Sequence, residues 1–362
     1  MSDHRRTDRS HENRIEPRIE SSKHLRWRAN EEGRQPNSGK WIDFPSMEMA
    51  AVDVAYEALH LRLEHVQRML PLAAYQHAEN LEHVHQLRVG CRRAATALST
   101  FRPLLGHKNK PLKRWLQDLR SAAGPARDLD VLLLELHQES ATGGARLKYI
   151  IEPFQRRRKK LQRRLVKVAK RALLKNQTGC LQQAITQCLQ SIADEGHANR
   201  VPFAAFARQI LPESARPMLS LSHDLPPYKG QGIAPAKLPK IERLHELRIA
   251  VKRFRYSIEL FHSVFPTSLR DSMYPQLKDI QQRLGALNDH ATMQKNFQWL
   301  MAKEIPDNRV IDLAARIVQQ HEAVMDGRLS FLEWWTPEQA DAFHAELEML
   351  LSDQATKQTT AE

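Results

Sequence analysis

Apolar residues recur every three to four positions through most of the chain after residue 46, which is the spacing of the buried face of an α-helix. The pattern predicts helices over 49–72, 79–101, 111–123, 128–137, 146–175, 180–195, 202–221, 240–265, 268–285, 289–304, 308–327 and 338–354. Runs of β-branched residues are short, and Leu, Ala, Arg, Gln and Glu dominate the composition, which favours helix. The predicted fold class is all-α.

The two ends of the chain lack this period. Residues 1–45 are polar and mixed in charge, and residues 356–362 are a short polar end, so we expect disordered tails at both places. Between them, the Pro- and Gly-rich stretch 222–240 predicts an irregular loop. The length suits two domains, and the predicted organisation is a first helical bundle over 46–200 and a second over 201–355.

A nine-residue pattern occurs twice, which indicates two copies of one module. HQLRVGCRR begins at His85 and HELRIAVKR begins at His245, and each copy is followed by a phenylalanine at the same offset, Phe101 and Phe261. On a helix, each copy places its cationic residues on one arc and an apolar stripe on the neighbouring arc. The apolar stripes are Leu87, Cys91, Ala94, Leu98 and Phe101 in the first copy, and Leu244, Leu247, Val251, Phe254, Ile258 and Phe261 in the second. The motif is therefore expected to build the core and an anion-binding face together.

Each motif helix is followed by a glycine with an aspartate four residues later. Gly124 precedes Asp128, and Gly285 precedes Asp289. Glycine tolerates the left-handed end of a helix, and aspartate can cap the next one. We therefore predict helix breaks at both glycines, with the aspartates as caps rather than as metal or acid–base groups.

The chain carries 55 Lys and Arg against 42 Asp and Glu, which gives a net charge of +13 and predicts a polyanionic partner. Between residues 145 and 175, thirteen residues are basic and one is acidic, and five of the basic residues recur at i+3 and i+4 on one helix face: Arg157, Lys160, Arg164, Lys167 and Arg171. No run of about 18 apolar residues exists, so no membrane span is expected. Three cysteines without a C-x-x-C pair, and an N-terminus without an apolar signal segment, favour the cytoplasm.

The duplicated motif, the helical pattern and the glycine–aspartate pairs together resemble the CHAD family, the conserved histidine α-helical domain, over residues 46–355. The resemblance implies two bundles of about four helices each, related by an internal pseudo-two-fold duplication, with basic faces lining a central groove or pore. It also implies binding of inorganic polyphosphate and association with polyphosphate granules. The first 45 residues contain no E-x-E-x-K motif of a fused CYTH domain, so the chain looks like a stand-alone CHAD protein, for which no catalysis is implied.

By matching position, the resemblance assigns polyphosphate binding to His85, Arg88, Arg92, Arg93, His245, Arg248, Lys252, Arg253 and Arg255. Ala95 stands in the first copy where Arg255 stands in the second, which removes one contact. The basic stretch adds Arg157, Lys160, Arg164, Lys167 and Arg171 to the predicted site. Cys91 is predicted to be a core residue.

Two other functions fit the charge. A helical nucleic-acid-binding protein is possible on charge alone, and weak nucleic-acid binding is expected at most, because the cationic helices lack interleaved aromatics for stacking on bases. An enzyme acting on phosphoanhydrides would use His85 or His245, but the motif faces are poor in the carboxylates that hold the metal for phosphoryl transfer. We therefore predict a non-catalytic protein with no cofactor and no metal. The oligomeric state stays open.

Overall fold

The computed structural model of the chain describes residues 40–105, 109–141, 148–173, 181–195, 201–228, 237–302 and 308–352. These residues belong to one compact unit, Gly39–Glu362. Residues 1–39 of the predicted first tail, and the predicted tail 356–362, lie outside the described residues.

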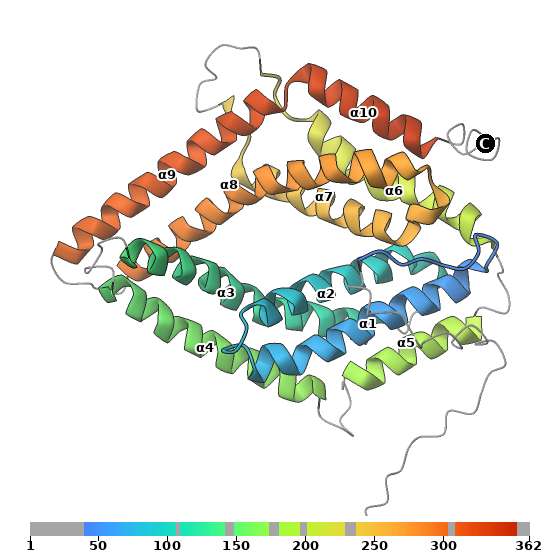
Figure 1. Cartoon of the computed structure of the whole chain (residues 1–362), viewed down its shortest axis with the longest axis horizontal. Helices are drawn as coiled ribbons and strands as arrows, with labels where there is room; N and C mark the ends of the chain where they lie inside the picture. The colour runs from blue at the N-terminus through green and yellow to red at the C-terminus, as the bar shows by residue number, and fades with distance from the viewer. Residues whose placement is uncertain are drawn as a thin grey trace, which may run out of the picture. The chain divides into compact units, whose positions relative to one another are not determined.

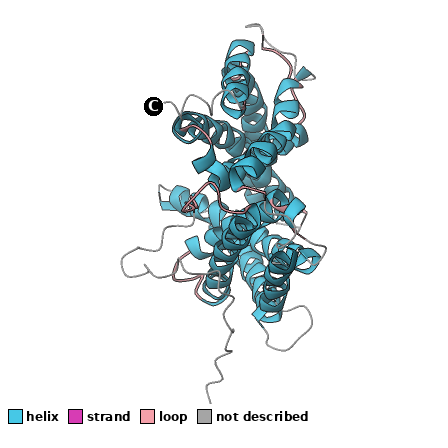
Figure 2. Cartoon of the chain, turned by 90° about the vertical axis from the view of Figure 1, so that its right-hand side faces the viewer, coloured by secondary structure: helices cyan, strands magenta, loops and turns pink. Residues whose placement is uncertain are grey.

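Helices joined by short connections make up the described part of the chain, which confirms the all-α fold class (Figure 1). They are α1 (Ala51–Tyr75), α2 (Glu82–Thr100), α3 (Lys110–Ala141), α4 (Lys148–Leu173), α5 (Leu181–Glu195), α6 (Phe203–His223), α7 (Ile241–Phe261), α8 (Tyr274–Met301), α9 (Asn308–Trp334) and α10 (Pro337–Leu351). Figure 2 shows no strand among the described residues. None of the described helices is both long and apolar enough to cross a membrane.

Each half of the chain packs its helices mainly in sequence order. α2 packs on α1 and α3, and α3 packs on α4; in the second half, α7 packs on α6 and α8, and α8 packs on α9. The two motif helices, α2 and α7, contact each other and join the halves (Figure 1). This order is the one that a duplication would give, but the duplication and the two-bundle boundary stay predictions.

The apolar stripes of both motif helices are buried, as predicted. All members of the two stripes lie in one continuous hydrophobic core that includes residues from both halves of the chain. Phe101 and Phe261, the matched phenylalanines, pack against each other with ring centroids 5.8 Å apart. Cys91 is buried, which confirms its role in the core, and burial raises the pKa of its thiol to about 12.

The entries to α1 and α6 are tied together by a reciprocal pair of backbone hydrogen bonds. The amide of Ala51 donates to the carbonyl of Val201 over 2.8 Å, and the amide of Phe203 donates to the carbonyl of Met49 over 2.8 Å. This short antiparallel bridge fixes the start of each half against the other.

The predicted helix breaks at Gly124 and Gly285 are wrong. α3 continues through Gly124 and Pro125, and α8 continues through Gly285. In α3, the buried stripe formed by Leu119, Ala123 and Ala126 crosses the glycine without interruption. Tertiary packing of that stripe outweighs the weak local preference for a break. Asp128 consequently lies inside a helix and does not cap one.

The well-packed part of the chain begins earlier than predicted, because residues 40–45 lie against α7. Ile42 is buried, and its amide donates to the carbonyl of Glu259 over 3.3 Å. Trp41 packs on the rings of His262 and Tyr274, with centroids 5.0 and 4.8 Å away. Two aromatic residues and an isoleucine within four positions are the sequence signal that distinguishes this segment from the polar tail before it.

Candidate functional site

The motif residues of α2 reach the neighbouring helix α3. Nη1 of Arg88 donates to the carbonyl of Gly124 over 3.0 Å and to Oδ1 of Asp128 over 2.8 Å. His85 lies half-buried one turn earlier, with Nε2 4.0 Å from a carboxylate oxygen of Glu82. Burial lowers the pKa of His85, and the nearby charges of Arg127, Arg88 and Arg92 lower it further against the effect of Glu82.

The second motif copy has the same neighbours on α8. Nδ1 of His245 lies 2.7 Å from Oδ1 of Asn288. The guanidinium of Arg248 lies over Gly285, where an added Cβ would meet its Nη2 at 3.6 Å. The glycine–aspartate pairs of the two halves thus sit opposite the motif arginines, Arg88 beside Gly124 and Arg248 beside Gly285.

Four cations of the two motifs gather where α2 meets α7, and we call Arg88, Arg92, Arg248 and Lys252 the cation cluster. Only Arg88 has an ion-pair partner within 4 Å among the described residues. Arg92, Arg248 and Lys252 make no ion pair and no side-chain hydrogen bond with any described residue, and Nε of Arg248 is buried without a partner. Buried donors without partners are costly, so these side chains are left with unused capacity to donate hydrogen bonds.

The electrostatics of the cation cluster reflect burial first and repulsion between the cations second. Burial lowers the pKa of Lys252 to about 6, and the positive charges of Arg248, Arg92 and Arg88 add to the effect. Burial also lowers the pKa of Arg92 to about 10, with further lowering from Arg88, Arg248 and Arg120. In the free protein at neutral pH, Lys252 is therefore largely a neutral amine. An anion placed among these groups would restore its charge.

Arg93 and Arg255, which were also predicted to bind polyphosphate, instead form contacts inside the protein. Arg93 forms a two-pronged ion pair with Glu259, with Nε to Oε2 at 2.8 Å and Nη2 to Oε1 at 3.1 Å. Tyr274 donates to Oε1 of Glu259 over 2.8 Å and accepts from Nη2 of Arg255 over 2.7 Å. Arg62 adds a second ion pair to Glu259 at 3.5 Å.

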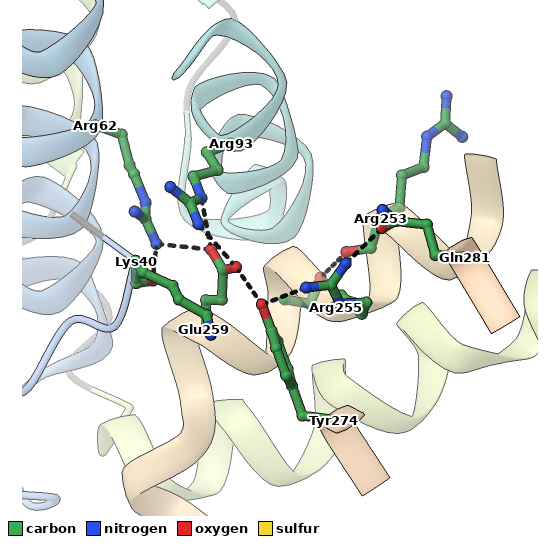
Figure 3. A network of polar contacts seen from close by, with 9 residues as sticks. Lys40, Arg62, Arg93, Arg253, Arg255, Glu259, Tyr274 and Gln281 are labelled. Carbon is green, nitrogen blue, oxygen red and sulfur yellow. Dashed lines mark hydrogen bonds and ion pairs between the residues drawn. The ribbon is translucent and has the colours of Figure 1, made fainter. Parts of the chain in front are cut away.

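We call Arg62, Arg93, Arg255, Glu259 and Tyr274 the Glu259 network (Figure 3). Glu259 is fully buried. The side chain of Arg253 is exposed and points away from this network (Figure 3). Sequence reasoning missed Glu259, although an acidic residue between Ile258 and Leu260, in the buried part of a motif helix, was the available signal.

The five basic residues predicted to form one row on α4 differ in their surroundings: Arg157 has partners, and the other four are exposed. The guanidinium of Arg157 stacks over Trp299 at 4.1 Å, and Nη1 donates to Asn296 over 3.1 Å. Lys160, Arg164, Lys167 and Arg171 are exposed. Arg158, which is not among the predicted site residues, is buried and forms an ion pair with Asp130 at 2.6 Å. The exposed members, and not Arg157, form the free cationic face.

Comparisons with known proteins show the family and the fold of the chain. Residues 57–298, from α1 to near the end of α8, match the family model of the CHAD domain. The chain belongs to the CHAD family. The crystal structure of the CHAD domain from the plant Ricinus communis is similar at 23% identity and a TM-score of 0.60, covering 88% of this chain and 98% of that one. PptA from Streptomyces chartreusis is similar at 19% identity and a TM-score of 0.55, covering 79% of this chain and 99% of that one. No curated protein matches the chain at a significant level.

In this CHAD protein, the predicted site residues fall into three groups. The cation cluster, with His85 and His245, lies along the α2–α7 contact. Arg93 and Arg255 belong to the Glu259 network, while Arg253 is exposed. The α4 residues lie across α3 from the cluster. No group of three or more His, Cys, Asp or Glu side chains with the geometry to hold a metal ion occurs among the described residues.

Proposed function

We propose that this CHAD protein binds inorganic polyphosphate, without chemical conversion, through the cation cluster. The observation that carries the proposal is the set of three partly buried basic side chains, Arg92, Arg248 and Lys252, that lack an ion-pair partner among the described residues. Family membership adds support, because the proposed ligand is the one that the resemblance to CHAD proteins implies. A linear polymer with about one charge per phosphate offers many acceptors at close spacing, so that it can reach several donors at once.

The energetic argument rests on repulsion that the polymer removes. Cations of α2 and α7 are held together by the packed apolar stripes of the same two helices, so that they cannot move apart. A polyanion relieves their repulsion, and it also returns condensed counterions to the solvent, which makes the affinity depend on salt. Arginine supplies forked donors and lysine a compact charge.

Nucleic-acid binding is the second candidate, and the surroundings of the cluster favour it less. Tyr256 is an aromatic residue whose charge interactions connect it with Arg92 and Arg248, and only 9% of its surface is exposed. A side chain buried to that degree offers no face on which a base could stack. No observation on the described residues favours catalysis on phosphoanhydrides, so we propose a binding protein.

A titration against polyphosphate of increasing chain length, at one fixed salt concentration, tests the proposal. We expect affinity to rise with chain length, with little binding of pyrophosphate and weaker binding of duplex DNA. The double variant Arg92→Gln/Lys252→Met should lower the affinity by about tenfold or more, because hydrogen bonds to charged groups contribute about 1.5–3 kcal/mol each. The control Arg208→Gln/Arg216→Gln removes the same charge from two exposed positions on α6.

Equal loss of affinity in the cluster variant and the control would show that only the overall charge matters. Equal affinity for duplex DNA and polyphosphate would remove the claim of specificity. We also propose that the protein associates with polyphosphate granules in the cytoplasm. A fluorescent fusion should coincide with granules in phosphate-replete cells and spread evenly in cells unable to make polyphosphate.

A further inference from the structure

A pocket of about 430 Å³ lies between α3 and α4, outside the cation cluster. Arg164, Lys167 and Arg171 of α4 line it, together with Asp118 and Ser121 of α3. Three of the exposed residues of the basic row thus converge on one hollow, where they face one carboxylate and one hydroxyl group. The balance of charge in the pocket is positive.

The cations of this pocket are unpaired, unlike Arg156 and Arg158 of the same helix. Arg156 pairs with Glu152, and Arg158 pairs with Asp130. Arg164, Lys167 and Arg171 make no ion pair and no side-chain hydrogen bond with any residue in the described part of the chain. Like charges at i+3 and i+4 repel each other on a helix, and no ion pair relieves that repulsion among the three cations that line the pocket.

Helix α3 separates this pocket from the cation cluster. α3 packs against α2 on one side and against α4 on another (Figure 1). Arg120 faces the cluster, since its charge acts on Arg92. Asp118, two residues earlier, lines the pocket, and two residues correspond to about 200° around a helix. A ligand that touched both places would have to pass around a helix about 10–12 Å wide.

We propose that the α3–α4 pocket is a second polyphosphate-binding site that acts independently of the cation cluster, so that one protein molecule can hold two polyphosphate segments and cross-link long chains. This inference rests on the proposed function, since it assigns the same class of ligand to a second place. Two separate sites on one rigid unit give avidity for a long polymer that neither site has alone. The carboxylate of Asp118 weakens the pocket for an anion, so that the cation cluster is the stronger site.

Two triple variants of α4 test the inference. Arg164→Gln/Lys167→Gln/Arg171→Gln removes the cations that line the pocket. The matched control, Lys159→Gln/Arg163→Gln/Lys170→Gln, removes the same charge from exposed positions of the same helix that do not line it. Calorimetric titration with tripolyphosphate measures the number of sites, and light scattering with long-chain polyphosphate measures cross-linking.

We expect two sites in the wild type and in the control, but one site in the pocket variant. The pocket variant should still bind long-chain polyphosphate, with at least a fivefold loss of scattering. Asp118→Asn should strengthen the weaker of the two sites by about two- to fivefold. If the wild type binds polyphosphate and the pocket variant matches the control in both measurements, the second site does not exist, while the proposed function stands. If the wild type does not bind polyphosphate at all, the proposed function and this inference both fail.

Discussion

The two motif helices, α2 and α7, contribute cations to two clusters that differ in the carboxylate that the protein supplies. In the Glu259 network, Arg62 and Arg93 surround a fully buried carboxylate that pairs with both of them. In the cation cluster, Arg92, Arg248 and Lys252 have no such carboxylate. The first arrangement is complete within the protein. The second has a carboxylate partner for Arg88 alone, and this difference separates a contact that joins the halves from the site that we propose for a ligand.

Neighbouring residues of one motif therefore have different tasks. Arg92 and Arg93 are adjacent in the sequence, but a helical turn of about 100° directs Arg92 into the cation cluster and Arg93 toward Glu259. A shared motif is thus no evidence for a shared role. Each of its cations has to be judged by whether the chain already supplies a counter-charge.

Removal of the buried carboxylate should give the largest effect on stability. Glu259→Gln leaves Arg62 and Arg93 buried without their counter-charge, and breaking a buried ion pair costs about 3–5 kcal/mol. We expect the free energy of unfolding, measured with urea, to fall by that amount. Glu64→Gln, at an exposed position on α1, is the control. A loss no greater than that of the control would mean that the Glu259 network does not hold the halves together.

Substitution of each of the two adjacent arginines in turn distinguishes the roles of the two clusters. Arg93→Gln should lower the free energy of unfolding by about 1–3 kcal/mol, because it leaves part of a buried carboxylate unsatisfied, and should leave polyphosphate affinity within about twofold. Arg92→Gln should lower polyphosphate affinity by about tenfold with little loss of stability. Parallel urea unfolding and binding titrations measure both. The same pattern in both variants would contradict the division between the clusters.

The pH dependence of stability that Lys252 causes has a definite sign, and its size per pH unit is below the two preceding effects. Its pKa is about 6 in the folded protein and near 10.5 when unfolded, so between these values the unfolded chain binds the additional proton. The stability of the wild type should therefore rise with pH in this window by at most about 1.4 kcal/mol per pH unit relative to Lys252→Met. The free energy of unfolding of Lys252→Met should exceed that of the wild type by the largest amount at pH 6 and below, and this difference should shrink as the pH rises.

Binding provides a second measurement of the same lysine. If a polyanion restores the charge of Lys252, complex formation near pH 7.5 takes up a proton in the wild type but not in Lys252→Met. Calorimetric titrations in two buffers of different ionisation enthalpy measure this uptake. Identical proton uptake in both proteins would show that Lys252 does not change its charge on binding.

The smallest effect concerns the carboxylate at the edge of the cation cluster. Asp128 pairs with Arg88, but 41% of its side chain is exposed, and exposed ion pairs contribute at most about 1 kcal/mol. Asp128→Asn should cost about 0.5 kcal/mol of stability and should raise polyphosphate affinity about twofold by freeing Arg88. Thermal unfolding and a titration measure the two changes. Lower affinity in this variant would mean that Asp128 orients Arg88 for the ligand.

The periodicity of apolar residues was sufficient to predict the helices and the buried faces of the motif. Those faces follow from spacing along one helix, which a sequence displays directly. The failures concern contacts between helices. The stretch around Gly124 and Pro125 looks like a break until it is known that neighbouring helices cover its apolar stripe, and no local rule contains that information.

The sequence predicted which residues belong to the candidate site, but not how the structure divides them into separate groups. Spacing showed that Arg88, Arg92, Arg248 and Lys252 share helix faces, and the structure brings them together. It could not show that Arg93 meets Glu259, which is 166 positions away, or that Arg157 meets Trp299. Whether a cation is free depends on partners that are distant in the sequence, so that charge counts along α4 overstated the surface available to a ligand.

The segment before α1 bears on how much of the chain is needed to fold. The carbonyl of Lys40 accepts a hydrogen bond from Arg62 over 2.9 Å, and the amide of Ile42 donates to the backbone carbonyl of Glu259. These residues precede the stretch that matches the family model, residues 57–298. A recombinant fragment cut to the family boundaries would therefore admit water to the one buried carboxylate on which both halves converge. The packed part of the chain extends N-terminally beyond the family boundary by the seventeen positions from Lys40 to Tyr56.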